Sequence, residues 1–535
     1  MRWHQRMTLN QPFFMNDAPL LQHARSPGEG IGMKTPRLAV ACVAAMLSLT
    51  VPLEAAVWIK GVDVSSLKKS EDLGGIYKTT ENVPGDALAI LKANGVNTIR
   101  LRVWVNPADG YNNHATTLAM AARAKALGLG VLVDFHYSDV WADPGHQTKP
   151  AAWSGYNLAQ LKTAVYNSTH SLCTALVAQG TPPEYVQVGN EINDGMLWPE
   201  GRLTTNGGNF TNLGQLLKEG IAAVRAASPQ TAVILHIAEG GTWTTVRSWF
   251  NKAVAQGVTW DYTGLSYYPY WHGSLSAFQT TINNAATTYS KPVVVCETAY
   301  PFTLGFADSQ PNLAGSTSLT AGYPATEAGQ RAMIKAIMNI LNAVPNGRGA
   351  GLFYWEGTWT PVTGNGWDNT DPASGNSWEN QALFDFTGKA LTSMSLFADY
   401  PAFPTSAFTA LELTNQAVSG DAADPDGDGI SNLVELAFGT NPRSPTLSLP
   451  GLPAPAVQSA SGSSYLTVGF RRPVPAIGLS YEVQTADSLT GPWSSNAVQV
   501  GLPVANGDGT ETMTYRDPLS GQTRRFMRVS VTRSP

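Results

Sequence analysis

Charged residues are scarce in this chain of 535 residues: they make up 14% of the composition, and the formal net charge is only −5. A protein that binds nucleic acid needs a basic face for the phosphates, so the composition argues against a nucleic-acid partner. The length allows two or three domains with a large core. The 15 tryptophans are numerous, and those in polar loops would suit flat, uncharged ligands such as sugars. For any single tryptophan, a place in the core is the ordinary expectation.

Cysteine is equally scarce, with three residues, Cys42, Cys173 and Cys296. Cys42 lies in an N-terminal segment that we expect to be removed, and two remaining cysteines provide no disulfide framework. Cys296 stands inside the apolar run PVVVCE, which predicts a buried structural thiol rather than a reactive one.

The sequence also has no apolar run of membrane-spanning length. The apolar run over residues 38–49 is too short to span, follows two basic residues and precedes a pair of alanines at 55–56, which is the pattern of an export signal. We therefore predict that translation starts at Met33, and that residues 1–56 comprise an extension and a signal peptide over about residues 33–56. A secreted or periplasmic protein is expected.

Eight apolar runs rich in β-branched residues recur between residues 57 and 356, most of them separated by stretches with helical patterning. This alternation implies parallel strands joined by crossovers. It predicts an α/β fold of the (β/α)₈ (TIM) barrel type over residues 57–398. A doubly wound open sheet is the alternative, but no glycine-rich nucleotide-binding turn follows the first run, and no organic cofactor is expected. The runs are VWIKGVDV, NTIRLRVW, GVLVDFHY, YVQVGNE, AVILHIAE, YTGLSYYP, PVVVCET and GLFYWE.

Polar residues gather toward the C-terminal ends of these runs, which is the face of a barrel that carries the active site. Arg100 and Arg102 are two positions apart and share a side of their strand, as do Asp134 and His136. A packed barrel interior would prefer Val, Ile and Leu at such positions. The other polar or aromatic strand-end residues include Glu191, His236, Glu239, Tyr267, Tyr268, Glu297, Trp355 and Glu356.

Glu191 and Glu297 end the fourth and seventh runs and are the candidates for chemistry. A carboxylate beside an apolar wall has a raised pKa, which suits a general acid. If both reach the barrel mouth they can face each other across a cleft, and retaining glycosidases need two carboxyls roughly 5–5.5 Å apart. A lone glutamate at a strand end is usually a solvated rim residue; a pair followed by aromatic loops is not.

Several longer stretches follow one another in order over residues 60–391. They are KGVDVSSL, GVNTIRLRVWVNP, DFHYSDVWADPGHQTKPAAW, VQVGNEINDGMLWPEG, LSYYPYWHG, ETAYPF and NSWENQALFDFTGKAL. GNE at the fourth run with a glutamate at the seventh resembles the large group of retaining (β/α)₈ glycosidases, and within that group the longer stretches resemble glycoside hydrolase family 53, the arabinogalactan endo-β-1,4-galactanases.

The resemblance implies Glu191 as acid/base and Glu297 as nucleophile. It implies that Asn190 holds the sugar 2-hydroxyl, that Arg100 or Arg102 and one of Tyr267 and Tyr268 bond the nucleophile, and that Asp134 and His136 line the subsite for the sugar whose linkage is cleaved. Each helper residue could instead be structural, as a buried ion pair or a satisfied core histidine. Tryptophans in the strand-end loops would stack on sugar faces; they are Trp141, Trp198, Trp271, Trp355, Trp359 and Trp367, with Trp141 and Trp355 as the candidates for substrate contact.

The barrel pattern stops near Ala398. We predict a linker over residues 399–457 and a small β-sandwich-like module over residues 458–535. The linker contains DPDGDGISNLVE at 424–435, which fits the D-x-D-x-D-G-x₅-E calcium loop and resembles thrombospondin type 3 and dockerin-like repeats. A structural Ca²⁺ is expected there, although a solvated acidic turn would look similar. The expected ligands are Asp424, Asp426, Asp428, the Ile430 carbonyl and Glu435.

The leading hypothesis is a secreted, monomeric, endo-acting retaining glycosidase that hydrolyses β-1,4-galactan in type I arabinogalactan. Another β-1,4-glycanase, a mannanase or cellulase, is the alternative within the enzyme class. A polysaccharide-binding protein without catalysis is the alternative outside it, and the presence of both carboxylates counts against it.

Overall fold

The computed structural model describes residues 59–399, 407–445, 452–460, 462–473, 479–507, 510–522 and 524–533. The N-terminal extension and the predicted signal peptide lie outside these residues. The chain divides into two units, Leu53–Pro425 and Asp426–Ser534, and each is described by itself. No helix among the described residues combines the length and the apolar character that crossing a membrane requires.

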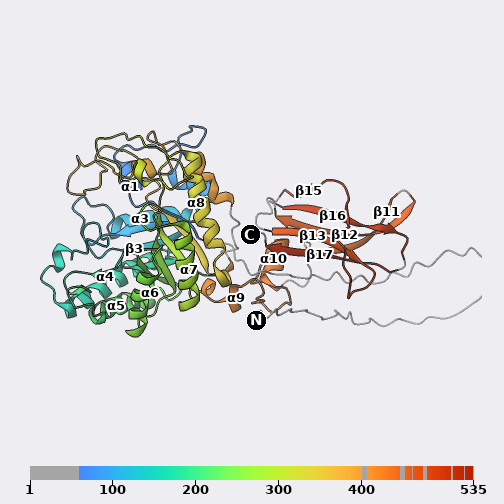
Figure 1. Cartoon of the computed structure of the whole chain (residues 1–535), viewed down its shortest axis with the longest axis horizontal. Helices are drawn as coiled ribbons and strands as arrows, with labels where there is room; N and C mark the ends of the chain where they lie inside the picture. The colour runs from blue at the N-terminus through green and yellow to red at the C-terminus, as the bar shows by residue number, and fades with distance from the viewer. Residues whose placement is uncertain are drawn as a thin grey trace, which may run out of the picture. The chain divides into compact units, whose positions relative to one another are not determined.

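The first unit is a closed barrel of eight parallel strands, which confirms the predicted TIM barrel (Figure 1). Around the barrel the strand order is β1, β2, β3, β4, β7, β8, β9 and β10, so sequence neighbours are also neighbours in space. Every one of the eight apolar runs supplies a strand. The strands are β1 (Ile59–Asp63), β2 (Thr98–Val103), β3 (Gly130–Phe135), β4 (Tyr185–Val188), β7 (Ala232–Ile237), β8 (Tyr262–Ser266), β9 (Val293–Thr298) and β10 (Gly349–Tyr354).

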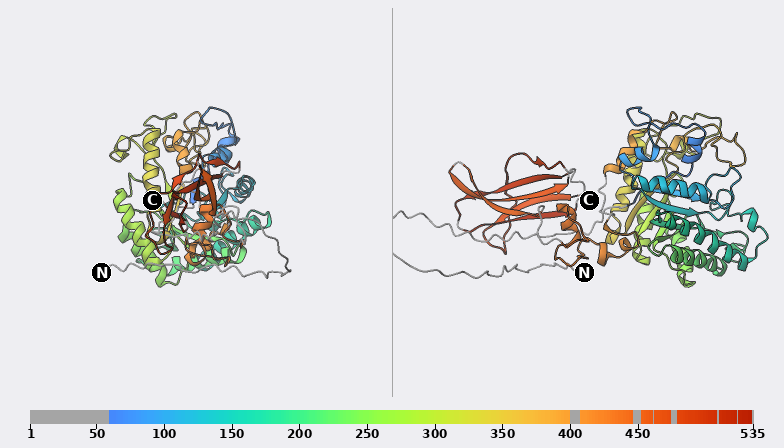
Figure 2. Two further views of the ribbon diagram at one scale, coloured as in Figure 1. Left: turned by 90° about the vertical axis from the view of Figure 1, so that its right-hand side faces the viewer. Right: turned by 180° about the vertical axis from the view of Figure 1, so that it is seen from behind.

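Helices follow the strands and cover the outside of the barrel (Figure 2). Several begin at a side chain that accepts a hydrogen bond from the first helical turn, as Asn113, Asn157, Ser274 and Thr326 do. After β10, where a (β/α)₈ barrel ordinarily has its last α-helix, the chain forms a 3₁₀ segment, Thr392–Asp399. The helices are α1 (Leu67–Asp72), α2 (Ala87–Ala93), α3 (His114–Ala126), α4 (Leu158–Ala178), α5 (Thr211–Ala227), α6 (Trp243–Ala255), α7 (Leu275–Tyr289) and α8 (Glu327–Asn342).

The loop after β4 carries a short antiparallel ribbon, β5 (Gly195–Met196) with β6 (Gly201–Arg202). At the opposite, N-terminal end of the strands, Phe408 and Leu413 join a buried cluster with strand residues such as Ile59. This part of the predicted linker therefore packs on the barrel. The short helix α9 (Gln416–Ser419) follows it.

The described residues of the second unit form strands and one helix, α10 (Asn432–Phe438). One sheet has the order β11-β12-β16-β14, with β15 also paired to β16, and β13 pairs with β17. Side chains of both sheets and of α10 form one core, in which Phe438, Phe470 and Val529 take part. The strands are β11 (Ala454–Ala460), β12 (Ser463–Pro473), β13 (Leu479–Ala486), β14 (Val498–Gln499), β15 (Val504–Ala505), β16 (Thr510–Ser520) and β17 (Phe526–Arg533).

Candidate active site

Glu191 stands three residues beyond the end of β4 and is 9% exposed. Its φ of 45° is left-handed, a strained conformation for a residue other than glycine and one that gathers at functional sites. The Ser266 hydroxyl donates to Glu191 Oε1 at 2.6 Å. Burial, followed by the negative charge of Glu297, raises the pKa of Glu191 well above its usual value. This carboxyl can therefore hold a proton at a pH where an exposed glutamate would be ionised.

Glu297 lies within β9 and is 6% exposed. Arg100 Nη2 donates to its Oε1 at 2.9 Å, and the Tyr268 hydroxyl donates to its Oε2 at 3.0 Å. Burial raises the pKa of Glu297 to about 7, while the charge of Arg100 acts in the opposite direction. The two carboxyls interact, so at intermediate pH the pair holds a single proton. That proton resides more favourably on Glu191, which has no cation bonded to it.

Both carboxyls line one cavity of about 650 Å³, a size typical of ligand sites. Arg100, Arg102, Asn190 and His136 also line it. The structure thus brings the two predicted catalytic residues to a common space at the C-terminal face of the barrel.

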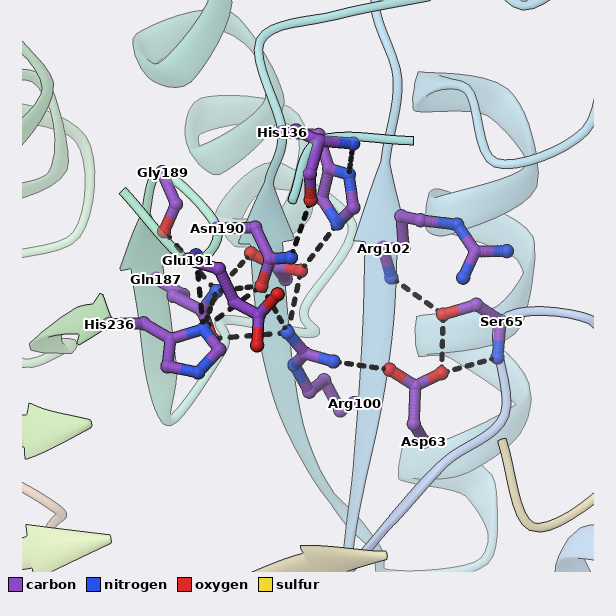
Figure 3. Close-up of polar contacts among 12 residues, drawn as sticks. Asp63, Ser65, Arg100, Arg102, His136, Gln187, Gly189, Asn190, Glu191 and His236 are labelled. Atoms are coloured by element: carbon purple, nitrogen blue, oxygen red, sulfur yellow. Dashed lines mark hydrogen bonds and ion pairs between the residues drawn. The ribbon is translucent and has the colours of Figure 1, made fainter. Parts of the chain in front are cut away.

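Arg100 lines this cavity and stands at the centre of a network of polar contacts (Figure 3). Its guanidinium is 1% exposed and contacts Asp63 at 2.8 Å, Asp134 at 2.8 Å and Glu297 at 2.9 Å. It also donates to Asn190 Oδ1 at 2.8 Å. Asn190 Nδ2 in turn donates to the Ala142 carbonyl at 2.8 Å, so the amide is held from both ends.

Arg102 is held differently. It donates to Glu356 Oε1 at 2.8 Å, and its guanidinium lies over the rings of Trp141, at 3.9 Å, and Trp104, at 4.8 Å. Arg102 therefore orients an aromatic wall of the cavity, whereas Arg100 bonds the carboxyl of Glu297. The alternative between the two arginines, left open by the sequence, is resolved in favour of Arg100.

Tryptophans form this wall. Trp355 lies 4.4 Å from Trp378 and 6.0 Å from Trp141, between ring centroids. Trp271 and Trp367 also line the cavity and are 52% and 47% exposed, so their faces are accessible. Trp359 lines it as well, whereas Trp198 does not and instead packs against the Arg202 guanidinium. Flat, accessible rings around a cavity suit the C–H faces of sugars.

Asp134, predicted to line the sugar subsite, and Tyr267, one of the two tyrosines predicted to bond the nucleophile, do not line the cavity. Asp134 is fully buried and its carboxylate accepts from Arg100, Gln187 and His136. Tyr267 donates to the Gly273 carbonyl at 2.9 Å and stacks on Phe278. Both residues occupy supporting positions, and Tyr268 is the tyrosine that reaches Glu297.

His136 does line the cavity, but protein groups occupy both of its ring nitrogens. Nδ1 accepts from the Ala142 amide at 3.0 Å, and Nε2 contacts Asp134 Oδ2 at 2.9 Å. The ring is therefore neutral and fixed with its proton on Nε2. It can offer a sugar its face but no further hydrogen bond.

A family comparison fits this geometry: the model of glycosyl hydrolase family 53 matches residues 59–397. The chain belongs to glycosyl hydrolase family 53. Over 347 residues it is 38% identical to an arabinogalactan endo-beta-1,4-galactanase of Thermothelomyces thermophilus. This match covers 63% of this chain and 98% of that protein.

Solved structures of the family agree with the barrel. The Ignisphaera aggregans GH53 catalytic domain has a TM-score of 0.61 at 39% identity, covering 66% of this chain and 98% of that one. A fungal β-1,4-galactanase structure has a TM-score of 0.56 at 37% identity, covering 64% and 99%. The chain is therefore a glycoside hydrolase, and the residues that match family 53 form its barrel.

Sequence reasoning missed several residues of the site. Gln187, Ser266 and Asp63 are polar, fully buried, and bonded to the residues described above. Each stands in or at the end of an apolar strand. The signal that could have identified them is a polar residue in such a strand, on the side that carries the other predicted site residues. His236 was noted at a strand end, without an assigned role.

A second group of acidic side chains lies in the predicted calcium loop. Carboxylate oxygens of Asp424, Asp426 and Asp428 lie within 4.8 Å of one another. An all-oxygen donor set of this size suits Ca²⁺. Glu435, also predicted as a ligand, is fully buried in α10, and its Oε1 accepts from the Thr440 hydroxyl at 3.3 Å. It is not one of the three clustered carboxylates.

Proposed function

We propose that this family 53 enzyme hydrolyses β-1,4-galactosidic linkages within the galactan of type I arabinogalactan, with retention of anomeric configuration. A relative named arabinogalactan endo-beta-1,4-galactanase, at 38% identity, and one named probable arabinogalactan endo-beta-1,4-galactanase A, at 36% identity, support the substrate. The observation that carries the proposal is the placement of two buried carboxyls with unlike neighbours at one cavity.

In the first step Glu297 attacks the anomeric carbon while Glu191 protonates the departing oxygen. Arg100 and Tyr268 favour the ionised form of the attacking carboxyl against the effect of burial, and they orient it through two hydrogen bonds. Glu191 keeps its proton because burial and the charge of Glu297 raise its pKa.

Forming the covalent intermediate neutralises Glu297, because its oxygen is then bonded to carbon. The charge that raised the pKa of Glu191 is removed, so Glu191 ionises more readily and can accept a proton from the attacking water. The same pair thereby serves as acid in one step and as base in the next.

The aromatic wall supplies binding. We propose that Trp355 and Trp141 stack on sugar residues beside the scissile bond, and that the exposed Trp271 and Trp367 contact residues farther along the polysaccharide. Internal cleavage follows if several sugars bind on both sides of the glutamates.

The test is product analysis with the full chain on unbranched galactan, β-mannan and cellulose. Galacto-oligosaccharides should appear from galactan, and Glu297→Ala should lower the rate by about 10⁴-fold or more. Release of manno- or cello-oligosaccharides instead would favour the alternative glycanases. Binding of galactan without hydrolysis by the wild type would favour the non-catalytic reading.

We further propose that the 424–435 loop binds a structural Ca²⁺. The three aspartates that lie within 4.8 Å of one another support it, as does the agreement of the whole loop with the calcium pattern. Ile430 would contribute its carbonyl, and Glu435 would reach the ion only after its side chain turns toward the aspartates. The ion would neutralise the clustered carboxylates and fix the loop before α10.

We also propose that the protein is exported through the signal at about residues 33–56 and acts as a monomer outside the cytoplasm. The apolar run at residues 38–49, with basic residues before it, supports export. N-terminal sequencing of the protein from its host should give a first residue near Ala56.

A further inference from the structure

A chain of hydrogen bonds leads from Glu191 into the barrel. Ser266, at the end of β8, is fully buried and lies between Glu191 and His236. Its Oγ is 2.6 Å from Glu191 Oε1 and 2.8 Å from His236 Nε2. A hydroxyl in this position must donate to one neighbour and can accept from the other.

His236 is neutral in this environment. His236 is completely buried, with 0% of its surface exposed to solvent. Burial, followed by the charge of Arg100, lowers its pKa well below the usual value, and His136 and His272 act in the same direction while Asp134 opposes them. A neutral imidazole carries a single N–H, so Nε2 and Nδ1 cannot both donate.

The surroundings of Nδ1 accommodate either tautomer (Figure 3). Gln187 Nε2, which can only donate, is 3.0 Å from Nδ1, and Asn190 Oδ1, which can only accept, is 2.9 Å from it. The Glu191 amide offers a second, longer donor at 3.4 Å. Gln187 has a further acceptor in Asp134 Oδ1 at 2.5 Å, so it stays bonded in both cases.

We propose that Ser266 and His236 form a hydrogen-bond relay whose direction reverses when Glu191 gains or loses its proton. This inference rests on the proposed acid/base role of Glu191. With Glu191 ionised, His236 Nε2–H donates to Ser266, Ser266 donates to the carboxylate, and Nδ1 accepts from Gln187.

With Glu191 protonated, its O–H donates to Ser266, Ser266 donates to His236 Nε2, and Nδ1–H donates to Asn190. The change breaks the Nε2–H bond and forms an Nδ1–H bond: the Nε2 proton passes through Ser266 to Glu191, Nδ1 takes up the one proton added from solvent, and Ser266 and His236 each carry the same number of protons in both states. The relay therefore satisfies the carboxyl in each step without placing a charge on the ring.

Ser266 and His236 are positioning residues in this scheme. A fixed donor would stabilise only the carboxylate and would oppose the acid step. A reversible one serves both steps, which is what a residue that alternates between acid and base requires. The charged groups that act on Glu191 are Glu297, Asp143 and Arg100. The two carboxyls would have to take up a proton to become donors, and the guanidinium has no acceptor, so none of them can exchange donor for acceptor at constant charge.

The experiment is ¹⁵N NMR of the full chain with labelled histidine, followed across pH without substrate. The His236 signals, assigned with single-histidine variants, should change from the Nε2–H to the Nδ1–H pattern as Glu191 takes up its proton. Glu191→Gln should abolish the change. His136 is an internal control in the same spectra, since Asp134 and Ala142 fix its proton on Nε2.

Kinetics give the second measurement. In Ser266→Ala the ionised carboxyl loses its donor and the protonated carboxyl loses its acceptor, so kcat should fall about tenfold while the basic limb of the kcat/KM profile stays near its wild-type pH; a clear upward move of that limb would indicate a fixed donor and contradict the relay. A His236 tautomer that stays constant through the Glu191 titration, or a ring that becomes cationic with it, would overturn the relay. If either occurs while galactan is hydrolysed, only the relay fails; absence of hydrolysis would instead count against the proposed function.

Discussion

Glu191 and Glu297 are both buried, yet their neighbours differ. Glu297 accepts from the Arg100 guanidinium and the Tyr268 hydroxyl, whereas Glu191 accepts from the neutral Ser266 hydroxyl. At the scale of single residues this contrast assigns the charge to Glu297 and the proton to Glu191.

Tyr268→Phe removes one of the two hydrogen bonds that hold Glu297. We expect kcat to fall by about 10²-fold, because the bond orients the attacking carboxylate. Tyr267→Phe is the matched control: it removes a bond to the Gly273 carbonyl, away from the cavity, and should leave kcat within about twofold while lowering stability by about 1 kcal/mol. Equal losses of kcat in the two variants would contradict the assignment of Tyr268.

Stability should also depend on these carboxyls. Burial raises the folded-state pKa of Glu297 to about 7 and that of Glu191 well above its usual value. A carboxyl whose pKa is higher in the folded than in the unfolded state contributes to stability at low pH. This contribution is complete at a pH below the unfolded-state pKa, near 4.5, and it is lost as the pH rises through the folded-state pKa. The thermal midpoint should therefore decrease as the pH is raised from 5 to 8, and Glu191→Gln should make that decrease smaller. A midpoint that rises over this range, with a larger rise in the wild type, would contradict the account.

The sequence singled out the two glutamates because each lies at or near the end of an apolar run, where a carboxylate is unusual. It could not separate Tyr267 from Tyr268, since neighbouring strand residues point to opposite faces and the strand's exact end decides which one reaches the mouth. It also could not show that His136 has both nitrogens occupied, because the spacing of Asp134 and His136 on one strand does not reveal that the ring turns toward that carboxylate and toward the Ala142 amide of the following loop.

At the scale of elements, β10 shows how closely the barrel strands approach. Gly351 has a φ of 131°, and a Cβ there would lie 1.9 Å from the Ile59 carbonyl oxygen of β1. The register of β10 with β9 is irregular at the same place. Only glycine allows this strand to close the barrel here.

Gly351→Ala should therefore lower the free energy of unfolding by about 3 kcal/mol. Gly74→Ala is the control: its φ of 91° is also positive, but no atom lies within 4 Å of the added Cβ. That variant should lose only about 1 kcal/mol. Denaturant unfolding of both variants measures the difference, and equal losses would show that the approach to β1 is not limiting.

The eight strands were predictable because parallel strands are buried on both faces and read as continuous apolar runs. The role of residues 399–457 could not be predicted from the sequence. Phe408 and Leu413 pack on the barrel, and Phe438 belongs to the core of the second unit. Isolated apolar residues in a proline-rich stretch carry no periodicity that would indicate which surface they cover.

At the scale of the whole molecule, the chain joins a catalytic barrel to a second unit that contains α10. Chelation of Ca²⁺ should lower the stability of the second unit, by about 2.7 kcal/mol relative to protein with free Ca²⁺ at a hundredfold excess over Kd. Calorimetry with and without chelator measures this shift. Asp426→Ala should abolish the response, whereas Asp487→Ala, which removes an exposed carboxylate paired with Arg525, should retain it. A wild type that does not respond to chelator would exclude the calcium proposal.

The central claim is that one carboxyl attacks the sugar while the other donates a proton. Proton NMR of the reducing ends, recorded during the first minutes of galactan hydrolysis before mutarotation, tests it most directly. Two successive displacements at the anomeric carbon predict that the β-anomer appears first. Initial release of the α-anomer would mean a single displacement by water, and would contradict the role given to Glu297.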